Sequence, residues 1–217
     1  MGILKALVLP YISGRDLHDS EFGEPFSEER VTSLSAVFRQ TVLDIGILID
    51  HKILHRDIKP ANILVRNNAL PSKEYPFPPP KQTFIDHDTL WDVHCPIDLV
   101  GTPDFMSPEQ ANLQSHPTND LYSVGSSFLS KLETLIQKAM GFLFSKASGL
   151  VVLNLQRTGN FLPKNLLEIL LRHVKQHSTA QARFLAEGFY RALASLVQKA
   201  QLRPRNAQEV LRILEGK

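Results

Sequence analysis

Apolar residues recur at helical spacing over long stretches of the chain. Between residues 31 and 49 they fall on one side of a helix, at Leu34, Val37, Phe38, Val42, Ile45 and Leu48. The same period predicts further helices over residues 120–140, 164–176, 181–199 and 206–214. Residues 141–161 fit neither a helical nor a strand period clearly.

Shorter apolar runs predict strands. One covers residues 3–9 and is ended by Ser13 and Gly14, and two more cover residues 62–65 and 83–85. Helices therefore dominate, and the chain shows no internal repeat or second domain. We expect a predominantly α-helical α+β fold.

The segment 66–82 has a different composition, because it contains five prolines, Pro71, Pro76, Pro78, Pro79 and Pro80. Proline cannot donate to a helix or a strand ladder, so we expect a surface loop or a polyproline-like excursion. We favour a plain insertion. A ligand for a domain with an aromatic groove is the other interpretation.

Composition places the chain among ordinary globular proteins. Hydrophobic residues make up 43% of its 217 residues and charged residues 21%. Lys plus Arg number 24 and Asp plus Glu 22, and this net charge of +2 does not favour nucleic acid or an anionic membrane as partner. Cys95 is the only cysteine, so no intrachain disulfide is possible and a reducing, cytoplasmic location is expected.

Targeting signals are weak. No apolar run approaches the roughly 18 residues that span a bilayer. Residues 1–10 have one lysine and a short apolar run, but Pro10 interrupts it and no cleavage site is clear, so we do not expect a signal peptide. Ala6 stands where the myristoylation pattern after Gly2 requires Ser or Thr.

Residues 55–64, with the sequence HRDIKPANIL, carry the strongest chemical signal. Asp57 can accept a proton from a hydroxyl nucleophile, Lys59 can neutralise a phosphate, and Asn62 can hold a metal ion. Their spacing lets one short loop aim all three side chains at the same point.

This loop resembles the catalytic loop of Hanks-type Ser/Thr protein kinases, in a form common in bacteria. The resemblance implies that Asp57 orients and deprotonates a substrate hydroxyl and that Lys59 stabilises charge on the transferring phosphoryl group. Asn62 would bind Mg²⁺. His55 would be structural, packed under the site, and Arg56 would bind a carboxylate or phosphate of the activation segment.

Residues 84–88, FIDHD, occupy the place of the family's Asp-Phe-Gly motif. By resemblance, Asp86 would hold the Mg²⁺ that bridges the ATP phosphates. His87 and Asp88 depart from the pattern, because histidine is polar and titratable and aspartate lacks the conformational freedom of glycine. The departure puts the inactive-to-active movement of this segment in question. Asp88 as a second, compensating carboxylate is an alternative.

Residues 101–110, GTPDFMSPEQ, resemble the family segment that ends in Ala-Pro-Glu. Thr102 would hydrogen-bond Asp57 and the neighbouring lysine, which also favours Ser/Thr substrates. Asp98 stands four residues earlier, where many members carry an activating phosphothreonine. We hypothesise that Asp98 pairs with Arg56 without phosphorylation; a solvated aspartate is the other interpretation.

Two further positions match structural residues of the family. Glu109 would form a buried ion pair with Arg203. Asp120 would brace the backbone of the catalytic loop from the start of a central helix, a role compatible with a simple N-cap.

Residues 7–17 resemble the last strand of a kinase upper lobe and the hinge. Leu9 would be the gatekeeper, the backbone of Pro10 and Ile12 would face the adenine edge, and Leu64 would form an apolar floor beneath it. An ordinary strand and turn is the alternative for this stretch.

The resemblance divides the chain into residues 1–17, the last upper-lobe strand and hinge, and 18–217, the lower lobe with the insertion at 66–82. The Gly-rich loop and the Lys–Glu pair of the upper lobe are absent from the sequence. The resemblance implies ATP, Mg²⁺ and a protein substrate as partners. The upper lobe is either supplied by another polypeptide or missing from this sequence because its start is misassigned. The rival hypotheses are a pseudokinase-like binding or scaffold lobe without catalysis, and a fragment without a stable fold.

Overall fold

The computed structural model describes residues 11–20, 28–66, 81–140 and 180–217. Several sequence predictions lie outside the described residues: the strand 3–9, Leu9 and Pro10, the prolines of 71–80, the stretch 141–161 and the helix 164–176.

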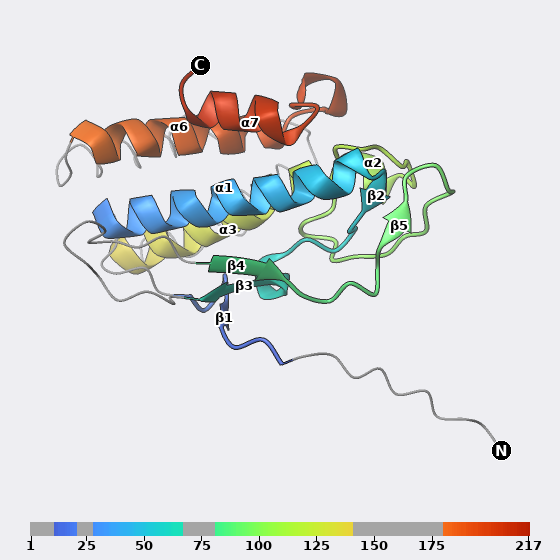
Figure 1. Ribbon diagram of the computed structural model, residues 1–217, viewed down its shortest axis with the longest axis horizontal. Helices are drawn as coiled ribbons and strands as arrows, with labels where there is room; N and C mark the ends of the chain where they lie inside the picture. Colours follow the sequence, from blue (N-terminus) through green and yellow to red (C-terminus); the bar gives the residue numbers. More distant parts are fainter. Residues whose placement is uncertain (1–10, 21–27, 67–80, 141–179) are drawn as a thin grey trace.

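The helices form layers over a small sheet (Figure 1). α1 (Glu28–Asp50) and α3 (Asn119–Met140) run through the middle, and α6 (Ala180–Leu196) and α7 (Ala207–Leu214) cover the side facing away from the strands. Within the described part, the short elements α2 (Pro108–Ala111), η1 (Pro60–Asn62) and η3 (Ala200–Leu202) connect this frame to the loops. The predominantly helical α+β prediction is thus confirmed.

The described long helices follow the predicted ranges closely. α1 extends the predicted 31–49 by a few residues, and α3 begins one residue before the predicted start. α6 ends at Leu196 instead of residue 199, because the 3₁₀ turn of η3 follows within a few residues. α7 begins after Asn206, whose side chain accepts a hydrogen bond from the backbone N–H of Glu209.

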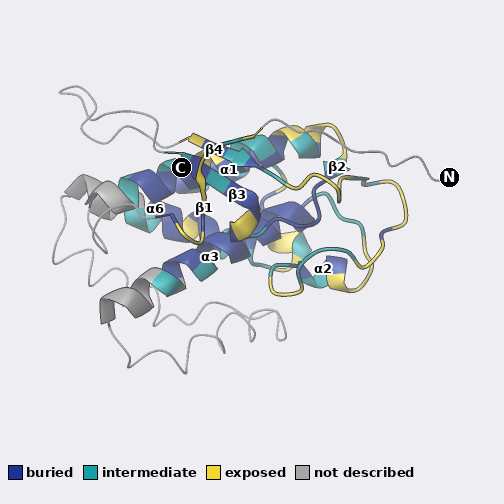
Figure 2. Ribbon diagram, turned by 90° about the horizontal axis from the view of Figure 1, so that it is seen from below, coloured by how far each residue is buried: buried dark blue, intermediate teal, exposed yellow. Residues whose placement is uncertain are grey.

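α1 is the central core helix. By length and mean hydropathy of 1.3, its segment Val31–Asp50 could cross a membrane, yet 56% of that segment is buried inside the fold. The predicted apolar side is the buried one, with Val37, Phe38 and Val42 fully buried. α1 packs on α3, α6, α7 and the strand β4 (Lys81–Phe84). Figure 2 shows how burial concentrates on these helices.

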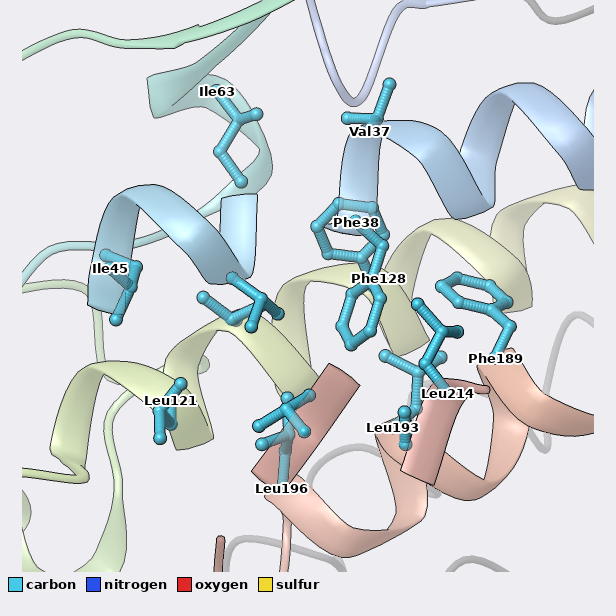
Figure 3. Packing of buried hydrophobic residues seen from close by; sticks show 14 of the residues in the cluster. Val37, Phe38, Ile45, Ile63, Leu121, Phe128, Phe189, Leu193, Leu196 and Leu214 are labelled. Atoms are coloured by element: carbon cyan, nitrogen blue, oxygen red, sulfur yellow. The ribbon is translucent and has the colours of Figure 1, made fainter. Parts of the chain in front are cut away.

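Three phenylalanines join three of the helices (Figure 3). The ring of Phe38 on α1 meets Phe128 on α3 at 5.2 Å and Phe189 on α6 at 5.1 Å, both edge-to-face. Phe128 and Phe189 are 6.2 Å apart in the same arrangement. Edge-to-face pairing at these distances favours the packing beyond simple burial.

α6 and α7 approach closely at a glycine. A Cβ added at Gly188 would collide with the backbone carbonyl oxygen of Leu214. Only glycine allows this contact between the two helices.

The sheet that supports the catalytic loop has the order β1-β3-β4, with β1 (Arg15–Asp16) and β3 (Ile63–Arg66) beside β4. β3 and β4 pair antiparallel, from Ile63 opposite Phe84 to Arg66 opposite Lys81. The predicted loop 66–82 was therefore too long at both ends, because its first residue and its last two residues belong to strands. The predicted strand 83–85 was also displaced, since β4 ends at Phe84.

A second pair joins β2 (Ile53–Leu54) to β5 (Trp91–Asp92), also antiparallel. These two-residue strands, like β1, were not predicted, because two residues are too few to show an alternating pattern. The β2–β5 pair ties the entry of the catalytic loop to the segment after Asp86.

Candidate active site

Asp57 lies at the centre of a closed network of side chains. The Thr102 hydroxyl donates to Asp57 Oδ1 at 2.7 Å, and Lys59 Nζ lies 2.7 Å from Asp57 Oδ2. Lys59 Nζ also donates to Thr102 Oγ1 at 3.0 Å. Asn62 Nδ2 donates to the Asp57 carbonyl at 3.0 Å and to Oδ2 at 3.2 Å. The structure thus brings together four side chains predicted from two distant segments.

The network determines the charge of Asp57. Burial alone would raise the pKa of this carboxyl, but the hydrogen bonds from Lys59 and Thr102 and the charge of Lys59 outweigh burial. The pKa of Asp57 is therefore lowered from its ordinary value. At neutral pH, Asp57 is an ionised acceptor with both oxygens oriented.

α3 holds the main chain of the catalytic loop from behind. Asp120, fully buried, accepts hydrogen bonds from the backbone N–H of His55 at 2.6 Å and of Arg56 at 2.9 Å. Burial raises the pKa of Asp120 to about 6, although these two N–H groups act to lower it. The carboxyl is thus mostly ionised at pH 7. About two turns further along α3, the Ser127 hydroxyl donates to the carbonyl of Ile58 at 3.4 Å.

Arg56 has a strained backbone and a buried side chain. Its φ of 69° lies in the left-handed region, which is costly for a residue with a Cβ and recurs at functional sites. Its Nε donates to the carbonyl of Thr89 at 2.6 Å, and its guanidinium lies 4.6 Å from the Trp91 ring centre. Trp91 is therefore a packing partner.

The hypothesised ion pair between Arg56 and Asp98 is not formed among the described residues. Burial lowers the pKa of Arg56, and the negative charge of Asp98 acts in the opposite direction. Asp98 is exposed, so water competes for its carboxylate. The aspartate influences Arg56 through charge at longer range, without a direct contact.

His55 is packed under the site, as the resemblance implied, and fully buried. Its ring lies 5.5 Å from the ring of Phe84 and 5.5 Å from that of His87. Burial, with the nearby His87, lowers the pKa of His55 to about 4. His55 is therefore neutral at physiological pH, and His87, which departs from the family pattern, still makes a ring contact there.

Asn62 and Asp86 lie at one end of the β3–β4 hairpin. The pairing of Ile63 with Phe84 continues as a hydrogen bond from Ile85 N to the Asn62 carbonyl at 3.0 Å. Asp86 follows directly, exposed and at a φ of 64°. Since Asn62 commits its amide nitrogen to Asp57, its amide oxygen is directed elsewhere.

This donor set fits Mg²⁺. The ion prefers oxygen ligands and is usually held by one or two protein groups completed by phosphates and water. Asn62 and Asp86 supply such oxygens at the same end of one hairpin. Within the described residues no group of three or more His, Cys, Asp or Glu could hold a metal by itself, so phosphates and water would complete the coordination.

A cleft of about 720 Å³ opens beside this hairpin. Asp16 and its neighbours in residues 14–19 form one wall, and Leu64, Ile85 and Thr134 contribute to the others. Leu64, the expected adenine floor, thus faces the cleft. Ile12 is half-buried and is not part of the described lining.

Glu109 and Arg203 form the predicted ion pair. Arg203 Nη2 lies 2.6 Å from Glu109 Oε2, with the Arg203 side chain fully buried and that of Glu109 16% exposed. Burial would raise the pKa of Glu109, but the hydrogen bond and charge of Arg203 prevail and lower it. Arg203 also donates to Thr118 O at 3.0 Å and Gln198 O at 2.9 Å, so one guanidinium joins three segments.

Sequence reasoning missed several residues that support the site. Thr89 donates to the His55 carbonyl, and Gln110 donates to the Arg56 carbonyl. Lys131 on α3 donates to the carbonyls of His18 and Ser20, below the cleft wall. Their partners are backbone atoms, which leave no trace in a sequence pattern. Asp16 lies within the hinge-like stretch 7–17, but its place in the cleft wall was not predicted either.

Comparison with known proteins agrees with this geometry. A family model described as protein kinase domain matches residues 5–140. The chain is 26% identical over 152 residues to serine/threonine-protein kinase Nek11 of Mus musculus, covering 60% of this chain and 22% of that protein.

Two further relatives are a human and a bacterial protein kinase. Death-associated protein kinase 2 of Homo sapiens is 33% identical over 125 residues, or 55% of this chain and 31% of that protein. Serine/threonine-protein kinase PknB of Mycolicibacterium smegmatis is 30% identical over 127 residues, or 57% and 19%. The chain thus matches less than a third of the length of each of these relatives.

Proposed function

This chain belongs to the protein kinase family, and from that premise we propose that it transfers the γ-phosphoryl group of ATP to Ser or Thr hydroxyls of proteins. The observation that carries the proposal is the closed network of Asp57, Lys59, Thr102 and Asn62. It supplies an ionised acceptor, a cation and an amide oxygen within one short loop.

Each side chain has a role that its contacts suit. Asp57, ionised and fixed through both oxygens, orients the substrate hydroxyl and takes its proton. The new O–P bond forms as the bond between the γ-phosphorus and the bridging oxygen of ADP breaks, and ADP leaves. Lys59 contacts both Asp57 and Thr102, from where its ammonium neutralises charge on the transferring group. Thr102 keeps both in register from the activation segment.

Asn62 and Asp86 would hold Mg²⁺ together with the ATP phosphates. When bound, this ion supplies neutralisation of the phosphate charge and orients the transferred group. The cleft beside Leu64 and Ile85 offers apolar surface for the base, and Asp16 offers an acceptor at its edge. Both features accord with a nucleotide as ligand.

The test is ATP-dependent phosphate incorporation into a protein acceptor, measured with the protein purified from its source cells and with this chain alone. Asp57→Asn should lower the rate by roughly a hundredfold or more, because the amide cannot accept the hydroxyl proton. Asp50→Asn is the matched control, since this exposed aspartate ends α1 away from the network.

Two results would contradict the proposal. One is incorporation that persists unchanged in Asp57→Asn. The other is a well-folded protein from source cells that incorporates no phosphate into any acceptor or into itself.

A binding or scaffold lobe without catalysis is the second candidate. Its support is the replacement of the family's Phe-Gly by His87 and Asp88, with His87 in contact with the buried His55. Nucleotide binding by calorimetry together with absent phosphate incorporation would favour this candidate.

A further inference from the structure

We infer that Gln110 is a positioning residue for phosphotransfer, which ties the activation segment to the catalytic loop through two main-chain carbonyls. The inference rests on the proposed function for its catalytic consequence. Its structural part stands on contacts outside the Asp57 network.

The side-chain amide of Gln110 makes two equally short hydrogen bonds. Nε2 donates to the carbonyl of Arg56 at 2.8 Å and to the carbonyl of Val100 at 2.8 Å. Arg56 directly precedes Asp57, and Val100 lies two residues before Thr102. One nitrogen therefore joins the two backbone segments whose side chains meet in the Asp57–Thr102 hydrogen bond.

The two segments lie in close contact, and one of them contains the strained backbone of Arg56. Arg56 has a φ of 69°, and Gly101, beside Val100, has a φ of 115°. A Cβ at Gly101 would collide with the Arg56 carbonyl oxygen, so the two chains are in close contact there. Gly101 adopts its φ without strain because it has no Cβ. The strained φ of Arg56 persists only where the surroundings hold it.

The burial of Gln110 argues that its amide serves to donate these hydrogen bonds. The residue is fully buried, and among the described residues its Oε1 has no hydrogen-bond partner. An unpaired buried acceptor is unfavourable, and an apolar side chain of similar size would avoid that cost. An apolar side chain would, however, leave the carbonyls of Arg56 and Val100 without the hydrogen bonds that Gln110 donates.

Hydrogen bonds also fix the backbone of Gln110 to the helical frame. It lies in α2, and its backbone N–H donates to the Ser107 hydroxyl at 3.0 Å. Ser107 in turn donates to Asn119 at the start of α3. The tie therefore extends from the frame of helices to the loop that carries Asp57.

The first experiment is hydrogen–deuterium exchange of the purified chain, comparing wild type with Gln110→Met. Without the two donated hydrogen bonds, residues 98–106 should exchange roughly tenfold faster, while α6 and α7 exchange as before. Gln82→Met is the matched control. Gln82 is also buried, but its amide donates to Asp44 on α1, so its loss should leave residues 98–106 unchanged.

If Gln110→Met does not fold, Gln110→Asn replaces it. The shorter amide can reach only one carbonyl, so a smaller, still local increase in exchange is expected. Unchanged exchange at residues 98–106, or an increase spread evenly over the chain, would overturn the inference.

The second readout is kinetic. Gln110→Met should lower kcat by roughly tenfold or more, with Gln110→Asn in between, because misplaced groups slow the chemical step. KM for ATP should stay within about twofold, since the cleft lining does not include Gln110. A rise in KM with unchanged kcat would contradict a positioning role. If Gln110→Met increases exchange at residues 98–106 but the wild-type protein shows no phosphotransfer, the proposed function is overturned and the structural role of Gln110 stands.

Discussion

At the scale of single residues, hydrogen bonds from neighbouring side chains restrict the orientation of the Asp57 carboxylate. One carboxylate oxygen accepts from Thr102, and the other accepts from Lys59 and Asn62. Because three donors hold its two oxygens, the carboxylate has one preferred orientation before any substrate arrives. Such preorganisation is what makes a fixed charge effective in catalysis.

Removing the Thr102 hydroxyl should change both rate and pH dependence. Thr102→Val deletes a hydrogen bond that lowers the pKa of Asp57, so that pKa should rise and the acid limb of kcat should move to higher pH. The rate at neutral pH should fall about tenfold. Thr102→Ser keeps the hydroxyl and should restore both, and an unshifted acid limb in the valine variant would contradict this account.

His55 should make the fold sensitive to acid. Its pKa is about 4 when folded, below the ordinary 6.5, so the unfolded chain binds the proton more readily between these values. The free energy of unfolding should therefore fall as pH decreases from 6.5 to 4, by about 3 kcal/mol from this residue.

Urea unfolding of wild type and His55→Leu over this pH range isolates that contribution. Asp120, whose pKa is raised to about 6, acts in the opposite sense, since it favours the folded state as pH falls through 6. It is present in both proteins, so the difference between them belongs to His55. Parallel pH profiles would show that His55 does not carry the effect.

The residues that the sequence revealed are those that stand in recognisable motifs, and Asp120 was among them although its partners are backbone N–H groups. Asp57, Lys59 and Thr102 stand in two strings of characteristic spacing. Gln110 and Thr89 bond to main-chain carbonyls, and every residue has one, so no pattern points to them. Of the two interpretations of Asp98, the solvated aspartate fits the structure, because Asp98 is exposed and forms no ion pair with Arg56.

At the scale of elements, Arg203 is the point where three segments meet. It pairs with Glu109 on α2, donates to Thr118 before α3 and to Gln198 after α6, and lies 5.1 Å from the Tyr122 ring centre. This buried cation is therefore one of the contacts that set the orientation of α2 relative to the helical frame, beside the Ser107–Asn119 hydrogen bond.

Arg203→Met should destabilise the fold by about 3–5 kcal/mol, because it removes the cation that pairs with the partly buried Glu109 carboxylate and the donor to the Thr118 and Gln198 carbonyls. Chemical denaturation of the variant measures this. Arg39→Met is the control, since Arg39 pairs with Glu215 on the exposed surface and should change stability far less. Equal losses in the two variants would refute the assigned role.

Long helices were predictable because apolar periodicity accumulates over many residues, as in α1 and α3. β1, β2 and β5 were not, because their pairing depends on contacts with distant segments. The ends of the Pro-rich loop were misplaced for a related reason. Arg66 and Lys81 are polar, and only their pairing across the hairpin identifies them as strand residues.

At the scale of the whole molecule, the edge-to-face contacts of Phe38 join α1, α3 and α6 into one core. Phe38→Ala should cost about 3–5 kcal/mol and lower the stability of the catalytic loop and the helices together. Unfolding followed by circular dichroism and by exchange of the loop residues should shift in parallel. Ile47→Ala, on the exposed side of the same helix, should have little effect.

The buried polar contacts of α3 constrain the number of residues between the side chains that make them. Asp120, Ser127 and Lys131 are spaced by seven and four residues, so they form one stripe along the helix, which supports the catalytic loop and the cleft wall. Each residue turns a helix by about 100°. Deleting a single residue between Ser127 and Lys131 would rotate the lysine out of the stripe, while leaving every side chain chemically intact. Along α3, spacing is therefore as tightly constrained as residue identity.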